Sequence, residues 1–232
     1  PDQFTMRSFK LGLGYNWKSG KTTEHNLTLL NINSIAPSDI TPSFDSILNA
    51  DPFLKASFER QFVIGSRYQF SFNNTHRVRK RFNYVANFQA STSGNIYNAL
   101  AKADVDTPGA KQVFGVPVAQ FLKGQVELRG YLRLNNRTQW LNRFLIGAVW
   151  AYGNSTIAPY NEQFFIGGSS SIRAFRIRTL GPGSFHSDEA VFQANESGEF
   201  KVEMNTEIRD NLWKFIKLGA FVDAGNIWFF KD

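Results

Sequence analysis

The chain contains no cysteine, only two methionines, and no uninterrupted apolar run of about 18 residues. Without cysteine it has neither disulfide bonds nor thiol chemistry. The missing apolar run, together with a mean hydropathy of −0.30, excludes membrane spans of the helical type. The first residues, PDQFTMRSFK, lack the apolar centre of a signal peptide. If the protein is exported, we therefore expect this sequence to be its mature form or a part of it.

Positive charge is in excess, with 26 Lys and Arg against 19 Asp and Glu and a net charge of +7. Such an excess is typical of proteins that bind nucleic acid or an anionic membrane surface. The cations here are spread along alternating segments rather than gathered in one patch, so we expect no nucleic-acid partner. No residue spacing typical of a metal site is present, and we expect neither a metal nor a cofactor.

The strongest pattern is an alternation of apolar and polar residues with a period of two. In residues 121–135 the apolar face carries Val126, Leu128, Leu132 and Leu134. The other face carries Gln125, Glu127, Arg129 and Arg133. Repeats of this pattern predict about eight strands. They cover residues 5–17, 22–34, 59–73, 79–92, 121–136, 138–152, 199–211 and 215–229.

The predicted strands, of about 11 to 16 residues, are longer than the usual five or six of globular proteins. A soluble β-sandwich would pack their apolar faces together, whereas a membrane barrel would turn those faces to lipid. Strand length and the charged polar faces favour the barrel, because about 9 to 11 tilted residues cross a bilayer. We therefore predict an all-β fold, a transmembrane antiparallel β-barrel, and keep the sandwich as the alternative.

Aromatic residues and connection lengths agree with a barrel in the outer membrane. Aromatic side chains at the ends of the apolar faces predict interfacial girdles: Tyr15, Trp17, Phe82, Tyr84, Trp140, Trp150, Tyr152 and Trp228. Residues 136–138 and 212–214 read as short turns, while 35–58, 93–120 and 153–198 read as long loops. Short turns on one side and long loops on the outside are the outer-membrane arrangement.

The loop 153–198 contains the segment FFIGGSSSIRAFRIRTLGPG, residues 164–183. A long loop with this many apolar residues needs burial, which we expect for Phe164, Phe165, Ile166, Ile172, Phe175 and Ile177. Gly167 and Gly168 permit a sharp reversal, which would place three arginines on a compact hairpin-like element: Arg173, Arg176 and Arg178. The barrel lumen is the one roomy place for such an element, and alternation turns two carboxylates of the last strands inward there, Glu207 and Asp223.

Enzymatic interpretations of this segment fail on its sequence. It lacks the G-K-[ST] ending of a phosphate-binding loop. Ser169, Ser170 and Ser171 stand in no G-x-S-x-G motif. The three histidines, His25, His76 and His186, fall in presumed rim or loop regions. We therefore expect no catalytic residue and no enzyme.

The segment GGSSSIRAF, followed by GEFKVEMNTEIRD and FVDAGNIW, resembles the bacterial surface antigen superfamily of BamA/TamA-like outer-membrane assembly and translocation barrels. In that family a long loop carries a VRG[FY]-type motif and folds back into the lumen. The resemblance implies that Arg173 pairs with Glu207 and Asp223 as a lumen-loop lock. It assigns the rest of the motif to Gly167, Gly168, Ser171, Ile172, Ala174 and Phe175. Ile172 replaces the family's usual Val, Ala174 replaces Gly, and the extension RTLGPGSF resembles the TamA-like lipoprotein branch.

The resemblance also implies a location and partners. It predicts the outer membrane of a Gram-negative bacterium, with contacts to outer-membrane lipid (or detergent), substrate polypeptides, and periplasmic or envelope accessory proteins. Residues 1–232 would form one partial outer-membrane β-barrel domain of about eight strands, half of a family barrel, and in the family POTRA domains precede the barrel. The expected function is insertion or translocation of proteins without bond chemistry. The alternatives are a passive outer-membrane pore and the barrel anchor of a patatin-like phospholipase fusion.

Overall fold

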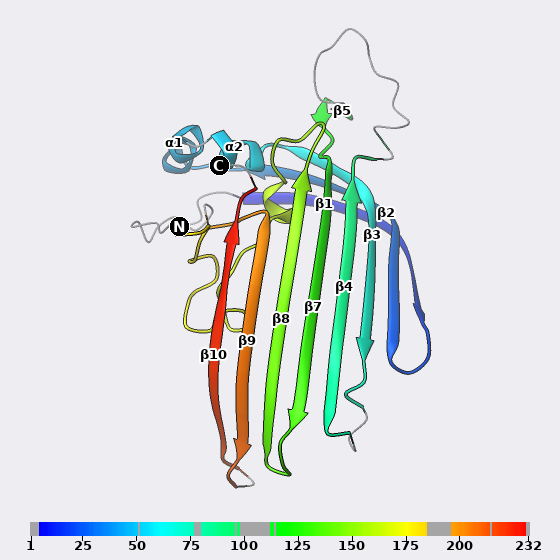
Figure 1. Cartoon of the computed structure of the whole chain (residues 1–232). Helices are drawn as coiled ribbons and strands as arrows, with labels where there is room; N and C mark the ends of the chain where they lie inside the picture. Colours follow the sequence, from blue (N-terminus) through cyan, green and yellow to red (C-terminus); the bar gives the residue numbers. More distant parts are fainter. Residues whose placement is uncertain are drawn as a thin grey trace.

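The computed structural model describes residues 5–50, 52–76, 80–95, 97, 112–113, 115–184, 196–213 and 215–230. Eight strands form one antiparallel sheet in the order β1-β2-β3-β4-β7-β8-β9-β10. They are β1 (Thr5–Lys18), β2 (Thr23–Ser38), β3 (Gln61–Asn73), β4 (Phe82–Ser93), β7 (Phe121–Arg133), β8 (Thr138–Ala151), β9 (Phe200–Asn211) and β10 (Lys217–Trp228). The sheet is a curved wall that does not close, with β1 and β10 at its edges (Figure 1).

The register separates two faces of this wall. Gln69, Gln89 and Gln125 stand opposite one another on one face, which we call the lumen face. Phe70, Phe88 and Val126 are opposite one another on the other, the outer face. Large apolar side chains on the outer face are exposed, as at Leu128, while Glu127 on the lumen face is buried. The predicted separation of Val126, Leu128 and Leu132 from Gln125, Glu127 and Arg129 is therefore confirmed.

The four tryptophans predicted to form girdles all belong to the outer face. Trp17 and Trp140 lie at the end of the sheet with the short turns, where β1 ends and β8 begins. Trp150 and Trp228 lie at the opposite end, where β8 and β10 finish. An indole has an apolar body and a polar N–H, so both ends of an apolar band suit it. The girdle prediction is confirmed for these residues.

The connection predicted as the long loop 35–58 contains regular structure. Strand β2 continues to Ser38, and two short helices follow, α1 (Pro42–Ala50) and α2 (Pro52–Phe58). Thr41 caps α1 because its Oγ1 accepts a hydrogen bond of 3.4 Å from the backbone N–H of Phe44. The Phe44 and Phe58 rings then meet edge to face at 5.3 Å. No helix in the described part of the chain has the length and apolar character needed to span a membrane.

Other boundaries also differ from the prediction. Within 93–120 the structure has a small hairpin, β5 (Gln112–Val113) and β6 (Val116–Pro117). Strands β3 and β4 begin at Gln61 and Phe82, later than predicted, and β7 ends earlier, at Arg133. Asn135 explains the last difference, because its Oδ1 accepts hydrogen bonds from the backbone N–H groups of Arg137 and Thr138, at 2.7 and 2.8 Å. This local turn replaces the ladder that a longer strand would need.

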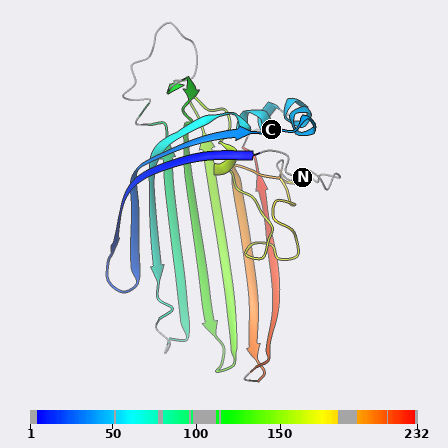
Figure 2. The same ribbon diagram turned by 180° about the vertical axis from the view of Figure 1, so that it is seen from behind.

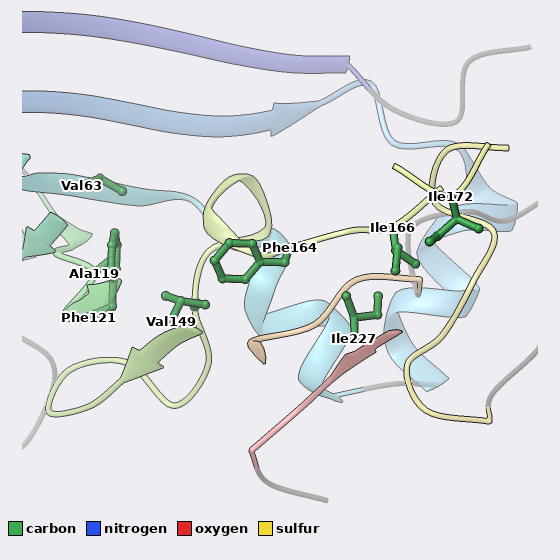
Figure 3. Packing of buried hydrophobic residues seen from close by; sticks show 9 residues of the cluster. Val63, Ala119, Phe121, Val149, Phe164, Ile166, Ile172 and Ile227 are labelled. Carbon is green, nitrogen blue, oxygen red and sulfur yellow. The ribbon is translucent and has the colours of Figure 1, made fainter. Parts of the chain in front are cut away.

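An apolar cluster lies on the lumen face at the long-loop end of the sheet (Figure 3). Strand residues, residues of the long loop and Ala119, which lies between β6 and β7, contribute to it together: Val63, Ala119, Phe121, Val149, Ala158, Phe164, Ile166, Ile172 and Ile227. The lumen face, which carries many polar side chains, therefore has a dry area at this end. The long loop after β8 packs against this area, and the packing positions the candidate site.

The assignment of faces predicts an asymmetric response to a new charge. Leu128→Arg places a guanidinium on the lipid-facing side, whereas Gln125→Arg, on the same strand, places one on the lumen face. We expect Leu128→Arg to lower the free energy of unfolding in lipid by about 2–4 kcal/mol and Gln125→Arg to have a much smaller effect. Denaturant unfolding of both variants in vesicles measures this, and equal destabilisation would contradict the assignment.

Candidate functional site

Residues 153–184 of the long loop fold back as a hairpin-like element. Two backbone hydrogen bonds close it, from Gly168 N–H to Phe175 O and from Arg178 N–H to Ile166 O, both 2.9 Å. Gly167 and Gly168 take φ values of 95° and 96°, which L side chains rarely adopt. Figure 2 shows this segment on the side of the sheet toward which β1 and β2 bend. The structure thus places the loop on the concave lumen face, as the sequence predicts.

The first edge of the hairpin packs against the wall. Phe164, Ile166 and Ile172 are buried, and Ile166 lies beside Ile227 of β10 (Figure 3). The prediction of burial is wrong for Phe175 and Ile177, which are 48% and 51% exposed. Residues after the turn also meet β10, since the Gly183 N–H donates to Ile227 O at 2.8 Å, but the side chains of Phe175 and Ile177 between these contacts stay uncovered.

Arg173 joins the loop to two strands. Its Nε and Nη2 donate to the two carboxylate oxygens of Asp223 on β10, at 2.8 and 2.7 Å. Its Nη1 donates to Glu207 Oε2 on β9 at 2.5 Å. The guanidinium also lies 3.6 Å from the centre of the Phe221 ring. The structure brings Arg173, Glu207 and Asp223 into one contact, which we call the lock.

Neighbouring groups complete the hydrogen bonding of the lock. Asn205 Nδ2 donates to Asp223 Oδ1 at 3.0 Å and to the Ser171 carbonyl oxygen at 2.8 Å. Arg209 forms an ion pair with Glu207. The hydrogen bonds from Arg173 to Asp223, together with the one to Glu207, raise the pKa of the Arg173 guanidinium further above its ordinary range. A lysine would not reproduce this contact, because its ammonium group lacks the planar guanidinium fork that binds a carboxylate in a bidentate manner.

Ala174, where the resembling family has glycine, fits the turn without strain. The Phe175 N–H donates to Ile172 O at 3.2 Å, so Arg173 and Ala174 occupy the two central positions. Among the described non-glycine residues, positive φ angles occur at Asp39 and Arg178, not at Ala174. The side chain of Ala174 is exposed, so the added methyl group meets no neighbour that must move.

A second contact between loop and wall, which the sequence reasoning missed, surrounds Glu203 of β9. This carboxylate is fully buried, and its Oε2 accepts a hydrogen bond of 2.7 Å from Ser171 Oγ and forms an ion pair of 2.8 Å with Lys201 Nζ. Its Oε1 pairs with Arg143, which also donates to Ser170 O at 3.1 Å. We call Arg143, Glu203 and Ser171 the second anchor.

A sequence signal for the second anchor existed. Alternation assigned Glu127 to the polar face, and it places Glu203 on the same face of its strand as Glu207. Glu127 accepts a 2.5 Å hydrogen bond from Arg143 Nε. Arg143 stands opposite both Arg129 and Asn205 in the register. The second anchor depends on which residues of three strands lie side by side. Periodicity shows which face a residue occupies, but it does not show the register between strands.

A third contact attaches the loop to the helices. The Arg178 guanidinium lies 4.4 Å from the ring centres of both Tyr160 and Phe165. Tyr160 in turn lies 4.4 Å from Phe58 of α2. Burial raises the pKa of the Tyr160 hydroxyl and lowers that of the Arg178 guanidinium. The loop is therefore held by cation–π and ring contacts around Arg178 and Tyr160, and by ion pairs at Arg173.

The remaining polar residues singled out from the sequence do not come together at the loop. His25 lies on the outer face and its Nδ1 is 2.8 Å from the Tyr68 hydroxyl. His76 lies in the turn after β3, and His186 falls outside the described residues. Within the described ranges no group of three or more His, Cys, Asp or Glu side chains is arranged to hold a metal ion.

A curved antiparallel sheet with an apolar outer face, a polar lumen face and an inward-folded loop defines part of an outer-membrane β-barrel. The chain belongs to the Omp85 superfamily, because the model of the Omp85 superfamily domain matches residues 7–232. The family resemblance read from the loop motif is thus confirmed. It places the chain in the outer membrane of a Gram-negative bacterium.

Individual relatives are more distant. The outer membrane protein assembly factor BamA of Neisseria meningitidis serogroup B is 28% identical over 88 residues, 36% of this chain and 11% of that protein. BamA from Haemophilus ducreyi lacking POTRA domains 1-3 has a TM-score of 0.66 at 12% identity, over 97% of this chain and 42% of that one. CdiB from Escherichia coli has a TM-score of 0.56 at 15% identity, over 96% and 34%. These likenesses support the fold, and the chain spans less than half of each relative.

Proposed function

We propose that this chain is the barrel part of an outer-membrane factor that inserts or translocates other polypeptides and makes or breaks no covalent bond. The lock carries the proposal. Arg173 holds a loop inside the lumen through carboxylates of two adjacent strands, β9 and β10. A loop attached in this way responds to the spacing of those strands, since sliding or separating them moves Glu207 relative to Asp223. Such a coupling suits a barrel whose wall and lumen rearrange together.

The lumen face also has groups suited to a passing polypeptide. A row of carboxamide side chains crosses five strands in register: Asn16, Asn26, Gln69, Gln89 and Gln125. These residues line a groove of about 680 Å³. A carboxamide both donates and accepts hydrogen bonds, as does each peptide group of an extended chain. A neutral surface of this kind supports contact with polypeptides of varied sequence.

The proposal is tested with the full-length protein reconstituted into liposomes. A urea-unfolded outer-membrane barrel protein is added, and its insertion is followed by heat-modifiable mobility in gel electrophoresis. We expect insertion to be faster than into empty liposomes or liposomes that contain an unrelated porin. Equal rates would contradict the proposal, and a large steady ion conductance without substrate would favour the passive pore. Release of fatty acid from the liposome phospholipids would favour the phospholipase fusion.

A further inference from the structure

Cations gather on the lumen face at the end of the sheet with the short turns. Arg133 and Arg209 both stand opposite Gln139, and the Arg133 N–H donates to Arg81 O at 2.8 Å. Lys217, the first residue of β10, stands opposite Asn211, which follows Arg209 by two residues on β9. Arg137 lies in the turn between β7 and β8, and its carbonyl accepts from Asn211 N–H. We call these five residues the cationic mouth: Arg81, Arg133, Arg137, Arg209 and Lys217.

Most of this positive charge is not balanced. Arg209 pairs with Glu207. For the other four cations, no carboxylate in the described part of the chain lies within ion-pair distance. The nearby Asp210 belongs to the outer-face register, opposite Leu218, and accepts a 2.6 Å hydrogen bond from Thr138. The mouth therefore presents a concentrated positive potential toward the lumen.

The outer face at the same end is different. Apart from Asp210 and Thr138, it carries large apolar side chains, which are exposed to 53%, 40% and 57% at Phe82, Trp140 and Leu218. A lipid molecule beside the wall would meet these residues, whereas the cations of the mouth project from the opposite face. An anion consequently reaches them through the aqueous lumen, at the end where the connections are short.

The mouth leads directly to the lock. A cavity of about 250 Å³ below the loop tip is lined by four arginines, together with Glu207 and residues 169–171: Arg129, Arg143, Arg173 and Arg209. Glu207 is shared, since it pairs with Arg209 of the mouth and with Arg173 of the lock. A carboxylate that enters from the mouth and binds Arg209 therefore competes with Glu207 for its partners.

We propose that the cationic mouth binds an acidic segment of a polypeptide and that its occupation loosens the lock. The inference rests on the proposed function and deepens it by naming the class of substrate segment. The cations lie on three strands, in one turn and just before β4, and neighbouring strands are about 4.8 Å apart, so one small anion spans only part of the mouth. An extended chain with several carboxylates spans all of it.

Fluorescein-labelled deca-glutamate, added to the full-length protein in detergent, is the probe. We expect saturable binding, measured by fluorescence anisotropy, that weakens as salt is raised, and no binding of deca-glutamine. Arg133→Glu with Lys217→Glu should weaken binding by at least about ten-fold at low ionic strength. The control, Lys10→Glu with Lys55→Glu, makes the same change of charge at the long-loop end and should leave the affinity within about two-fold. Equal weakening by both pairs would overturn the site.

Two further readouts complete the test. Saturating deca-glutamate should accelerate chymotrypsin cleavage after the exposed Phe175, and unchanged cleavage would overturn the link to the lock. Nanodiscs that contain phosphatidylglycerol should leave peptide binding intact, and its loss there would assign the mouth to lipid headgroups instead. Peptide binding is measured without substrate insertion, so a failure of the insertion assay and a failure of the mouth are distinguishable.

Discussion

Replacing Arg173 by alanine is expected to release the loop from the lumen wall while the sheet remains folded. The substitution removes three side-chain hydrogen bonds to Glu207 and Asp223. It also leaves the two carboxylates near one another without the cation that separates their charges. Hydrogen bonds to charged groups contribute about 1.5–3 kcal/mol, so local detachment of the loop should become easier by about 3 kcal/mol, or roughly a hundred-fold.

Chymotrypsin cleavage after Phe175 measures the detachment, and heat-modifiable mobility shows that the barrel still folds. Arg173→Ala should be cleaved much faster than the parent and should insert substrate poorly. Arg173→Lys should fall between them, because it retains the charge without the fork. Arg176→Ala removes an exposed cation three residues away and serves as the matched control. Parental cleavage and full activity of Arg173→Ala would rule out the lock.

Replacing Glu203 by alanine should have the largest effect on the stability of the sheet. The change leaves Arg143 and Lys201 without their buried partner and removes the acceptor of the Ser171 hydroxyl. Breaking a buried ion pair by removing one partner destabilises by about 3–5 kcal/mol. We expect a loss of that size in the free energy of unfolding, measured with denaturant in vesicles. Glu203→Gln retains the volume and should lose less.

Glu24→Ala is the control for a lumen-face carboxylate. Glu24 pairs with Lys18 at 2.6 Å, but its side chain is 60% exposed. An exposed pair of this kind contributes about 0–1 kcal/mol. If Glu203→Ala and Glu24→Ala were equally mild, the second anchor would contribute no more than a solvated ion pair.

The strands and their faces were predictable because the alternation covers long segments, such as residues 121–135. The helices α1 and α2 were not, since they are short and depend on a cap at Thr41 and on packing between Phe44 and Phe58. The end of β7 was not predictable either, because the Asn135 side chain accepts hydrogen bonds there in place of a ladder bond.

The candidate site was only partly predictable. Alternation indicated that Glu207 and Asp223 face inward, but the choice of Arg173 among the loop arginines came from the family resemblance. The exposure of Phe175 was missed because the apolar content of a segment shows only that part of it needs burial. It does not show which of its side chains are buried. The second anchor was missed because Arg143 joins Glu127 and Glu203 only through the register of three strands.

The central claim is that Arg173 holds the loop through Asp223, and a double-mutant cycle tests it most directly. Hydrogen exchange of the amides in residues 166–178 gives the opening free energy for the parent, Arg173→Ala, Asp223→Ala and the double variant. The Arg173 amide itself donates to Asp223 Oδ2 at 3.1 Å, so exchange reports on the contact. We predict a coupling free energy of about 1.5–3 kcal/mol between the two residues. If the effects of the two single substitutions add up to that of the double variant within about 0.5 kcal/mol, Arg173 and Asp223 act independently, and this result would contradict the lock.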